Sequence, residues 1–343
     1  MNTKILTNTK INQKYFIPRF IVGMSRAGTT WLGKCLNEHP DTAVFGESLY
    51  WGRAYVEPQK DDTYSLEQVD SILSRLIQKG CEAFLGKGNG NLKKITRNNL
   101  NHIIQTGFYD TEFVPTPVSV YKKICQTISE AEGKKESIEK TPHHINWIDK
   151  IIRAMPNSLF VVMVRDPYGF MLSYKHQGDR LQEPLRTKFK RLYHPLICSL
   201  LWRGYIRATM YAIRCYPQNT LVIRTKDMKN NPESVLHEVQ NFFLLNPVPN
   251  LANKIPPDNS SFPIGEPPSL KSEDIFWINL VAGKEISEFG FKKQVATIEP
   301  LGIFFSIFHL PIWILINFIH LKNETSGSVF QYLIRWFNQL SMS

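Results

Sequence analysis

The chain has 343 residues, enough for one large or two ordinary domains, and 43% of them are hydrophobic, which excludes an intrinsically disordered protein. Lysine and arginine outnumber aspartate and glutamate by 41 to 30, giving a net charge of +11 that favours an anionic ligand, an acidic polymer or a membrane surface as partner. No nucleic-acid recognition motif accompanies this charge, so nucleic acid is not expected as a partner.

The cysteines and the N-terminal residues bear on the cellular compartment. Five cysteines are scattered along the chain and mostly lie in apolar helical patterns, which indicates reduced thiols in the cytoplasm. There is no CxxC pair or His/Cys cluster, so no metal site is expected. Residues 1–15 form a polar lead-in without the apolar core of a signal peptide, and export by that route is not expected.

The first predicted strand, within residues 16–22, leads into a glycine loop. Residues 23–30 (GMSRAGTT) have the spacing of a P-loop, G-x-x-x-x-G-K-[ST], with Thr29 in the position of the lysine. Backbone N–H groups and the N-terminus of the following helix could still hold an anion. The missing lysine would have contacted the β- and γ-phosphates, so a nucleoside triphosphate is less expected. The alternative is a plain glycine turn.

The remaining elements follow in a strand–helix rhythm with one interruption. A helix is expected at 30–37 and a short strand at 41–45. Residues 52–135 are a polar, mostly helical insertion. Because it interrupts the alternation, we expect it to cover the functional site or to contact an acceptor substrate. Further strands are expected at 137–140, 159–164 and 220–224, with helices at 144–154, after Pro167, at 196–215 and at 232–244. This alternation predicts a three-layer α/β fold with a central parallel sheet flanked by helices.

Four segments carry chemical groups directly after predicted strands. They are Arg26 to Thr30, Gly46-Glu47, Glu139 to Pro142, and Arg165-Asp166-Pro167 with Ser173. Ligands of open parallel sheets bind beyond the carboxyl ends of the strands, so these segments are expected to meet at one site.

In this order and placement, the P-loop variant, His39-Pro40, Gly46-Glu47, Lys140-Thr-Pro and Arg165-Asp-Pro-x5-Ser resemble the PAPS-dependent sulfotransferases. The closest likeness is to their bacterial carbohydrate/tyrosylprotein-type branch. It covers about residues 16–292, poorly over 52–135, and defines 16–299 as a sulfotransferase domain with a P-loop-like fold.

The resemblance implies a co-substrate, 3′-phosphoadenosine 5′-phosphosulfate (PAPS), and residues that bind it. The 5′-phosphosulfate would be held by the loop and the first helical turn: Arg26, Ala27, Gly28, Thr29, Thr30 and Trp31. Arg165 and Ser173 would bind the 3′-phosphate. The alternative is that Arg165 pairs with Asp166 and Ser173 faces solvent.

The resemblance also implies catalytic roles. Glu47 would be the general base for the acceptor hydroxyl, and Lys140, with Arg26, would neutralise the bridging oxygen of the departing donor. The alternatives are a surface carboxylate and a solvated lysine. Adjacent His143 and His144 would face different directions on a helix, which speaks against a metal site.

Residues 300–343 form an apolar and amphipathic helical tail. No residue from Pro300 to Leu321 is charged, yet Ser306, His309, Asn317 and His320 fall on one narrow helical stripe. A second amphipathic pattern follows Gly327. The preferred interpretation is a helical hairpin that docks the enzyme on the inner face of the membrane; the alternative is a helix that packs in the core or a homodimer interface.

The preferred function is therefore transfer of a sulfuryl group from PAPS to a hydroxyl of a glycan or glycolipid. A P-loop kinase is the alternative within enzymes, and Thr29 together with the lack of a clear Walker-B aspartate speaks against it. A membrane-associated binding protein with a degenerate site is the alternative from another class.

Overall fold

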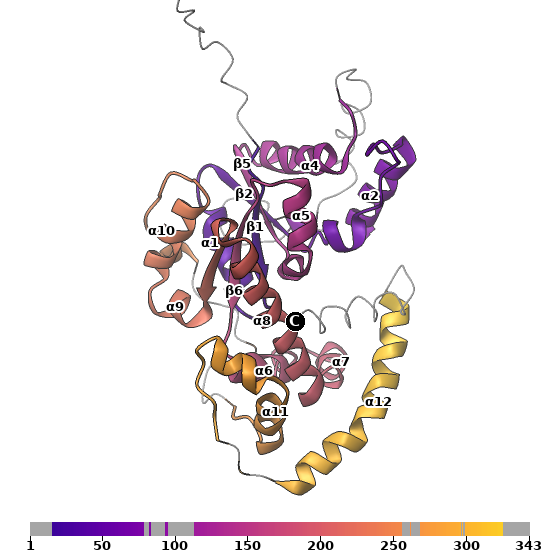
Figure 1. The fold of residues 1–343 in the computed structure, drawn as a ribbon, viewed down its shortest axis with the longest axis vertical. Coiled ribbons are helices and arrows are strands. Elements are labelled where there is room, and N and C mark those ends of the chain that lie inside the picture. Colours follow the sequence, from indigo (N-terminus) through magenta and orange to yellow (C-terminus); the bar gives the residue numbers. More distant parts are fainter. Residues whose placement is uncertain are drawn as a thin grey trace, which may run out of the picture.

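The structure is a computed structural model that describes residues 16–78, 82–83, 93–94, 113–255, 261, 268–295, 297 and 299–324, apart from the side chains of 53, 77–78, 82–83, 93–94 and 316–324. Its centre is a twisted sheet with the strand order β4-β3-β2-β5-β1-β6-β7 (Figure 1). Five strands are parallel: β1 (Arg19–Gly23), β2 (Thr42–Gly46), β5 (Glu136–Lys140), β6 (Leu159–Val164) and β7 (Thr220–Arg224). The short strands β3 (Glu82–Ala83) and β4 (Lys93–Lys94) extend the β2 edge antiparallel.

Helices cover both faces of this sheet (Figure 1). The crossovers β1–α1–β2 and β5–α5–β6 run in opposite directions along the sheet, so right-handed connections place α1 and α5 on opposite faces. The helices are α1 (Thr29–Asn37), α2 (Leu66–Gln78), α4 (Pro117–Ala131), α5 (Ile148–Ala154), α6 (Pro167–Lys175), α7 (Leu185–Arg191), α8 (Pro195–Cys215), α9 (Thr225–Asn230), α10 (Pro232–Phe242), α11 (Ser272–Glu288) and α12 (Pro300–Glu324). Short helical turns are η1 (Tyr50–Ala54), η2 (Pro142–Trp147), η3 (Pro217–Asn219) and η4 (Ala252–Lys254).

The core lies along the two central strands. All five residues of β1 are buried, as are five of the six in β6, which explains their continuous apolar sequences. Phe20 of β1 stacks on Phe160 of β6 at 5.0 Å between ring centroids and on Tyr121 of α4 at 5.7 Å. Residues from the insertion thus complete the core above β1.

The predicted three-layer α/β fold with a central parallel sheet is confirmed, and the structure adds elements that the sequence patterns did not predict. The insertion is not only helical, because Lys93–Lys94 form β4. Helices α7, α9 and α11 were not expected. The helix predicted at 144–154 begins as the 3₁₀ turn η2 after Pro142.

The C-terminal residues are described as far as Glu324, where α12 ends. Within that part of the chain, no helix is both long and apolar enough to cross a membrane. The second amphipathic pattern, after Gly327, lies outside the described residues.

Gly23 allows the loop to leave β1 against the neighbouring strand. Its φ is 112°, and a Cβ built there would lie 2.4 Å from the carbonyl oxygen of Met163. We expect Gly23→Ala to lower the free energy of unfolding by roughly 3 kcal/mol, because steric overlap adds to the cost of a positive φ. The matched control is Gly133→Ala, where φ is 63° and no heavy atom lies within 4 Å, with an expected loss of about 1 kcal/mol. Equal losses in chemical denaturation would contradict the steric explanation.

Candidate active site

The loop from Gly23 to Gly28 turns its backbone toward the carboxyl edge of the sheet. The N–H of Met24 donates to the carbonyl of Met163 on β6 at 2.9 Å, which fixes the start of the loop. Arg26 and Gly28 have positive φ angles of 64° and 91°. Gly28 is the N-cap of α1 and supplies no side-chain cap, so the first N–H groups of α1 remain available to an anion.

Arg26 and Arg165, from the loops after β1 and β6, lie against each other. Arg165 donates from Nη1 to the backbone carbonyl of Arg26 at 2.8 Å. Arg26 donates from Nε to the hydroxyl of Ser173 at 3.2 Å and from Nη2 to the hydroxyl of Ser261. The two serine hydroxyls are 2.6 Å apart, and both side chains are buried. Ser173 therefore faces this cluster and not solvent.

Asp166 does not neutralise Arg165 through an ion pair in the described part of the chain. Its carboxylate instead accepts from the N–H of Gly169 at 2.7 Å and caps α6. The Arg165 side chain is instead directed to the loop, where it contacts the carbonyl of Arg26.

The electrostatics of this cluster are those of neighbouring, partly desolvated cations, with Asp166 as the acidic group that acts on Arg165 and Lys229. Burial lowers the pKa of Arg26, and burial together with the neighbouring Arg26 cation lowers the pKa of Arg165, although Asp166 acts in the opposite direction. Desolvation and the Arg165 cation also lower the pKa of Lys229 on α9, even though that side chain is exposed. A bound anion would relieve this repulsion.

Glu47 and Lys140 meet at the ends of β2 and β5. The register pairs Gly46 with Lys140, and the N–H of Glu47 donates to the carbonyl of Lys140 at 3.0 Å. The Lys140 ammonium lies 2.5 Å from Oε1 of Glu47. The lysine side chain is 6% exposed and the glutamate 45%, so the ion pair reaches from the buried strand end to the open edge.

A buried carboxylate supports the turn that carries Glu47. Glu139 precedes Lys140 on β5 and, because strand side chains alternate, points to the opposite face of the sheet. It accepts hydrogen bonds from the hydroxyls of Ser48, of Tyr121 at 2.8 Å and of Thr141 at 2.9 Å. Glu47 itself has a φ of 54°, so the Ser48–Glu139 bond holds a turn whose backbone is unfavourable on its own.

Two further residues that were predicted to bind the donor, Ala27 and Trp31, make contacts within the protein. Ala27 is fully buried, and its carbonyl accepts from the hydroxyl of Thr225 at 2.7 Å. The Trp31 indole is 7% exposed and donates to the carbonyl of Ile255 at 2.8 Å. Trp31 thus holds residues near η4 against α1, and only its backbone N–H faces the loop.

His143 and His144 have separate environments. His143 is hydrogen-bonded to the hydroxyl of Tyr205, which in turn contacts Ser25 of the loop. His144 is fully buried, both of its ring nitrogens lack hydrogen-bond partners, and burial lowers its pKa to about 3. Among the residues that the structure describes, no cluster of three or more metal-binding side chains is present.

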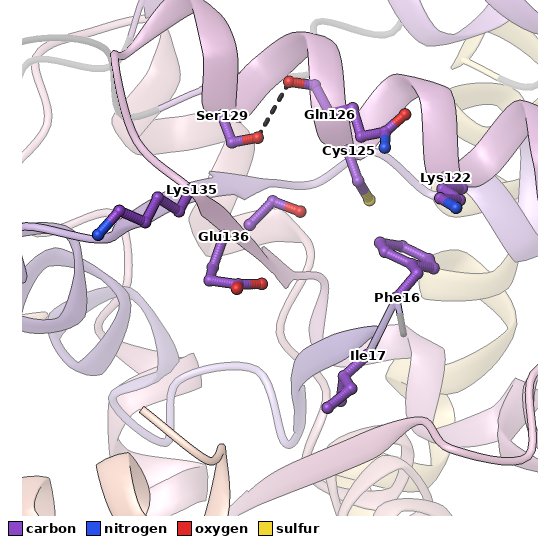
Figure 2. A pocket seen from close by; sticks show the side chains of 9 residues that line it. Phe16, Ile17, Lys122, Cys125, Gln126, Ser129, Lys135 and Glu136 are labelled. Carbon is purple, nitrogen blue, oxygen red and sulfur yellow. Dashed lines mark hydrogen bonds between the residues drawn. The ribbon is translucent and has the colours of Figure 1, made fainter. Parts of the chain in front are cut away.

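A separate pocket of about 140 Å³ opens beside the starts of β1 and β5, under α4 (Figure 2). Its lining side chains come from the amino ends of these strands and from one face of α4: Phe16, Ile17, Lys122, Cys125, Gln126, Ser129, Lys135, Glu136 and Ser137. It therefore lies at the edge of the sheet opposite to the loop and is not part of the candidate site.

The sequence patterns missed four contributors to the site. Ser261 and Lys229 come from segments to which no binding role was assigned, and Ser48 and Glu139 each stand next to a recognised residue. Strand alternation after Lys140 could have indicated that Glu139 is buried. No local pattern indicates that Ser261 contacts Arg26, 235 residues away.

The site thus combines a P-loop-like turn that lacks the triphosphate lysine with basic residues at the ends of neighbouring strands. A model of the sulfotransferase family matches residues 18–246, and the chain belongs to that family. A comparison with curated protein sequences finds no significant match.

Solved structures similar to the chain include the sulfotransferase domain from the curacin biosynthetic pathway, at 15% identity, with 82% of this chain and 100% of that chain covered and a TM-score of 0.46. The sulfotransferase domain of the Synechococcus PCC 7002 olefin synthase is also 15% identical, with 78% and 96% covered and a TM-score of 0.42. A sulfotransferase from Alicyclobacillus acidocaldarius is 15% identical, with 81% and 98% covered and a TM-score of 0.43.

The buried Glu139 predicts a pH dependence of stability. Burial raises its pKa to about 7 despite the three hydroxyl donors, so the stability from this group is full below its unfolded pKa of 4.5 and is lost as the pH rises through about 7. We expect the difference in unfolding free energy between wild type and Glu139→Gln to fall by about 3 kcal/mol over that interval and then stay constant.

Urea denaturation across the pH range measures this difference. His144 titrates in the opposite sense, its stability contribution being lost as the pH falls below 6.5, and its Nδ1 lies 3.5 Å from Oε1 of Glu139. Because residues in contact do not contribute additively, the comparison is repeated in a His144→Asn background to separate the two groups. The exposed Glu130→Gln is the control. A Glu139→Gln difference as flat as that of the control would contradict the buried-carboxyl interpretation.

Proposed function

We propose that this sulfotransferase moves the sulfuryl group of PAPS to a hydroxyl of a glycan or glycolipid by in-line displacement. The observation that carries the proposal is the pair Arg26 and Arg165, two desolvated guanidiniums that have no carboxylate partner among the described ion pairs and lie beside the open N-terminus of α1. Partly buried cations without an ion-pair partner favour an anionic ligand, and this donor carries phosphates at two ends.

The residues present suit such a donor. The first N–H groups of α1, with Thr29, Thr30 and Arg26, would hold the 5′-phosphosulfate. Arg165 and Ser173 would hold the 3′-phosphate. The hydroxyls of Ser173 and Ser261 now accept hydrogen bonds from Arg26, so a phosphate oxygen would replace them as acceptors at the same guanidinium.

Glu47 and Lys140 would divide the proton and charge transfers. The oxygen of the acceptor hydroxyl would form a bond to sulfur while the bond between sulfur and the bridging oxygen of the donor breaks. Glu47 would accept the proton that this hydroxyl loses. Lys140 would stabilise the charge that develops on the leaving 3′,5′-diphosphoadenosine. An ammonium has three donors, so Lys140 can contact Glu47 and the bridging oxygen together.

The exposed position of Glu47 supports an acceptor that reaches the site from outside, such as a glycan hydroxyl. A glycolipid is further supported by the apolar surface of α12. The insertion 52–135, which packs beside η2 through η1, is the segment expected to meet the acceptor.

Two alternatives remain to be separated by experiment. A P-loop kinase would bind magnesium nucleoside triphosphate, which Thr29 in the lysine position disfavours. A binding protein with a degenerate site would bind the nucleotide without transferring sulfate.

The first test is calorimetric binding of 3′,5′-diphosphoadenosine without magnesium. We expect Arg26→Gln and Arg165→Gln each to weaken binding at least about tenfold, because each removes a charge-assisted contact to a phosphate. Arg214→Gln, on the exposed end of α8, is the matched control and should bind as wild type. Preference of the wild type for Mg-ATP would overturn the proposal.

The second test concerns Glu47. With radiolabelled PAPS and a panel of glycans and glycolipids, we expect Glu47→Gln to lower kcat by about a hundredfold or more, because it removes the base, while binding of 3′,5′-diphosphoadenosine stays unchanged. Glu130→Gln should transfer sulfate at the wild-type rate. Equal rates for Glu47→Gln and wild type would remove Glu47 as the base, and nucleotide binding without any transfer would favour the binding protein.

A further inference from the structure

Helix α12 presents two different faces. It lies at the periphery of the molecule, beside α11 and the C-terminal end of α7 (Figure 1). Eight of the 15 large hydrophobic side chains that are exposed in the described part of the chain belong to it. They are Leu301, Phe304, Phe305, Ile307, Phe308, Ile312, Ile314 and Leu315, with 51% to 73% of each side chain exposed.

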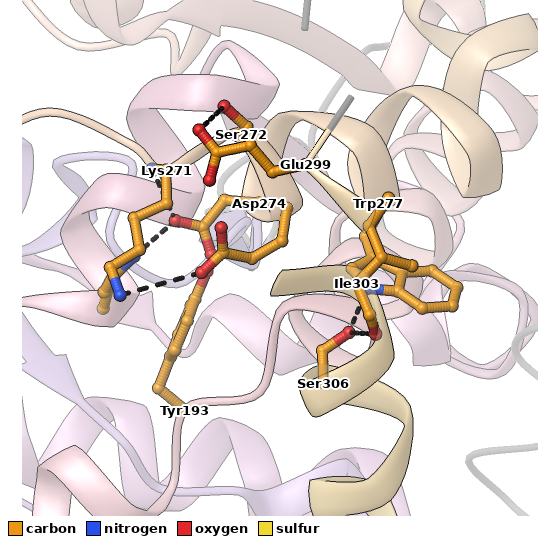
Figure 3. Close-up of polar contacts among 10 residues, drawn as sticks. Tyr193, Lys271, Ser272, Asp274, Trp277, Glu299, Ile303 and Ser306 are labelled. Atoms are coloured by element: carbon orange, nitrogen blue, oxygen red, sulfur yellow. Dashed lines mark hydrogen bonds and ion pairs between the residues drawn. The ribbon is translucent and has the colours of Figure 1, made fainter. Parts of the chain in front are cut away.

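The opposite face of α12 is attached to the protein by polar contacts (Figure 3). Ser306 is buried; its hydroxyl accepts from the Trp277 indole of α11 at 2.8 Å, and its carbonyl is hydrogen-bonded to His194 at 2.9 Å. The Trp313 indole donates to the carbonyl of Leu192, the C-cap of α7, at 3.1 Å. His309 stacks on His194 at 5.7 Å.

These contacts fix the orientation of the helix. At roughly 100° per residue, Ser306 and Trp313 point to one side, and Leu301, Phe304, Phe308 and Leu315 to the other. The polar stripe expected from the sequence is thus used, at Ser306 and His309, to dock α12 on its own domain. Its apolar face consequently looks outward.

A basic helix, α7, lies beside α12. Helix α7 ends where Trp313 contacts Leu192, and no residue of α7 is buried. It carries Arg186, Lys188, Lys190 and Arg191 and no acidic residue, together with the half-exposed Leu185. All four basic side chains are exposed, and the acidic residues near them are Asp179, 3.7 Å from Lys190, and Glu183, which interacts with Arg186 and Lys190.

We propose that the outward face of α12 and the basic helix α7 together form a surface that binds an anionic lipid bilayer, with α12 lying in the plane of the interface. The apolar side chains would enter the headgroup boundary, and the cations of α7 would attract the acidic headgroups. A second copy of this chain is the less suitable occupant, because a symmetric contact would bring two positively charged α7 helices together. The proposal does not depend on the sulfuryl donor or acceptor.

The test is co-sedimentation of the full chain with vesicles of phosphatidylcholine alone or mixed with phosphatidylglycerol. We expect binding to the anionic vesicles that weakens at least tenfold when the salt is raised to about 0.5 M. The triple variant Phe304→Ser/Phe305→Ser/Phe308→Ser should lose at least tenfold in binding, because apolar area no longer enters the interface. Leu244→Ser, an equally exposed leucine at the end of α10, is the control and should bind as wild type.

A second variant tests the charge without altering α12. Lys188→Glu/Arg191→Glu should abolish the preference for anionic vesicles, whereas Lys284→Glu, at an exposed position of α11, should keep it. Point substitutions are preferable to removal of the tail, since removal would take away the partners of Trp277 and His194. Binding of 3′,5′-diphosphoadenosine reports on folding and on the active site independently.

Two results would overturn the proposal. One is binding of the triple variant and of the charge variant to anionic vesicles at the wild-type level. The other is a wild type that ignores vesicles and sediments as a dimer, which the triple variant converts to a monomer; a second copy would then cover α12.

Discussion

Two like charges held side by side govern the candidate site. Repulsion between their charges favours separation of Arg26 and Arg165, but the main chain prevents it. All five residues of β1 are paired with β6, and Arg165 donates a hydrogen bond to the carbonyl of Arg26. The fold therefore holds two guanidinium groups close together at the candidate site, and their repulsion opposes folding unless an anion is bound. The guanidinium of Arg26 donates to the hydroxyls of Ser173 and Ser261 and not to a carboxylate, which would have neutralised its charge. A bound anion could replace these hydroxyls as the acceptor.

The second half of the site depends on polar groups that never meet solvent. The turn after β2 has left-handed residues at Glu47 and Leu49, and neither is a glycine. Such a backbone persists because the hydroxyl of Ser48 is bonded to Glu139, which two further hydroxyls surround. Buried contacts on one face of the sheet thus fix the direction of the Glu47 carboxylate at its edge. Substitutions of Ser48 or Glu139 should therefore disturb the site although neither side chain lies in it.

Much of this arrangement follows from local sequence. The apolar runs at β1 and β6 and the spacing of Gly23 and Gly28 predict buried strands that end at a loop, and parallel strand ends bring Glu47 to Lys140. The contacts of Ser261 with Arg26 and of Trp31 with Ile255 could not be predicted, because each joins segments more than 200 residues apart. The local sequence pattern of one segment does not indicate which other segment it contacts. The edge strands β3 and β4 have two residues each, too few for any periodicity.

The outward face of α12 was foreseen only in part. The polar stripe indicated that one side of the helix differs, but whether that side meets water or protein depends on Trp277 and His194, which belong to elements far away in sequence.

The ion pair between Glu47 and Lys140 has a further consequence. At 2.5 Å the two groups neutralise each other, so the attraction of the site for an anion comes mainly from the arginines and the N-terminus of α1. In the proposed mechanism, the groups that attract the donor would therefore differ from the carboxylate that accepts the proton. Specificity for the donor and the rate of the chemical step can then change independently during evolution, because a substitution at one pair leaves the field of the other nearly intact.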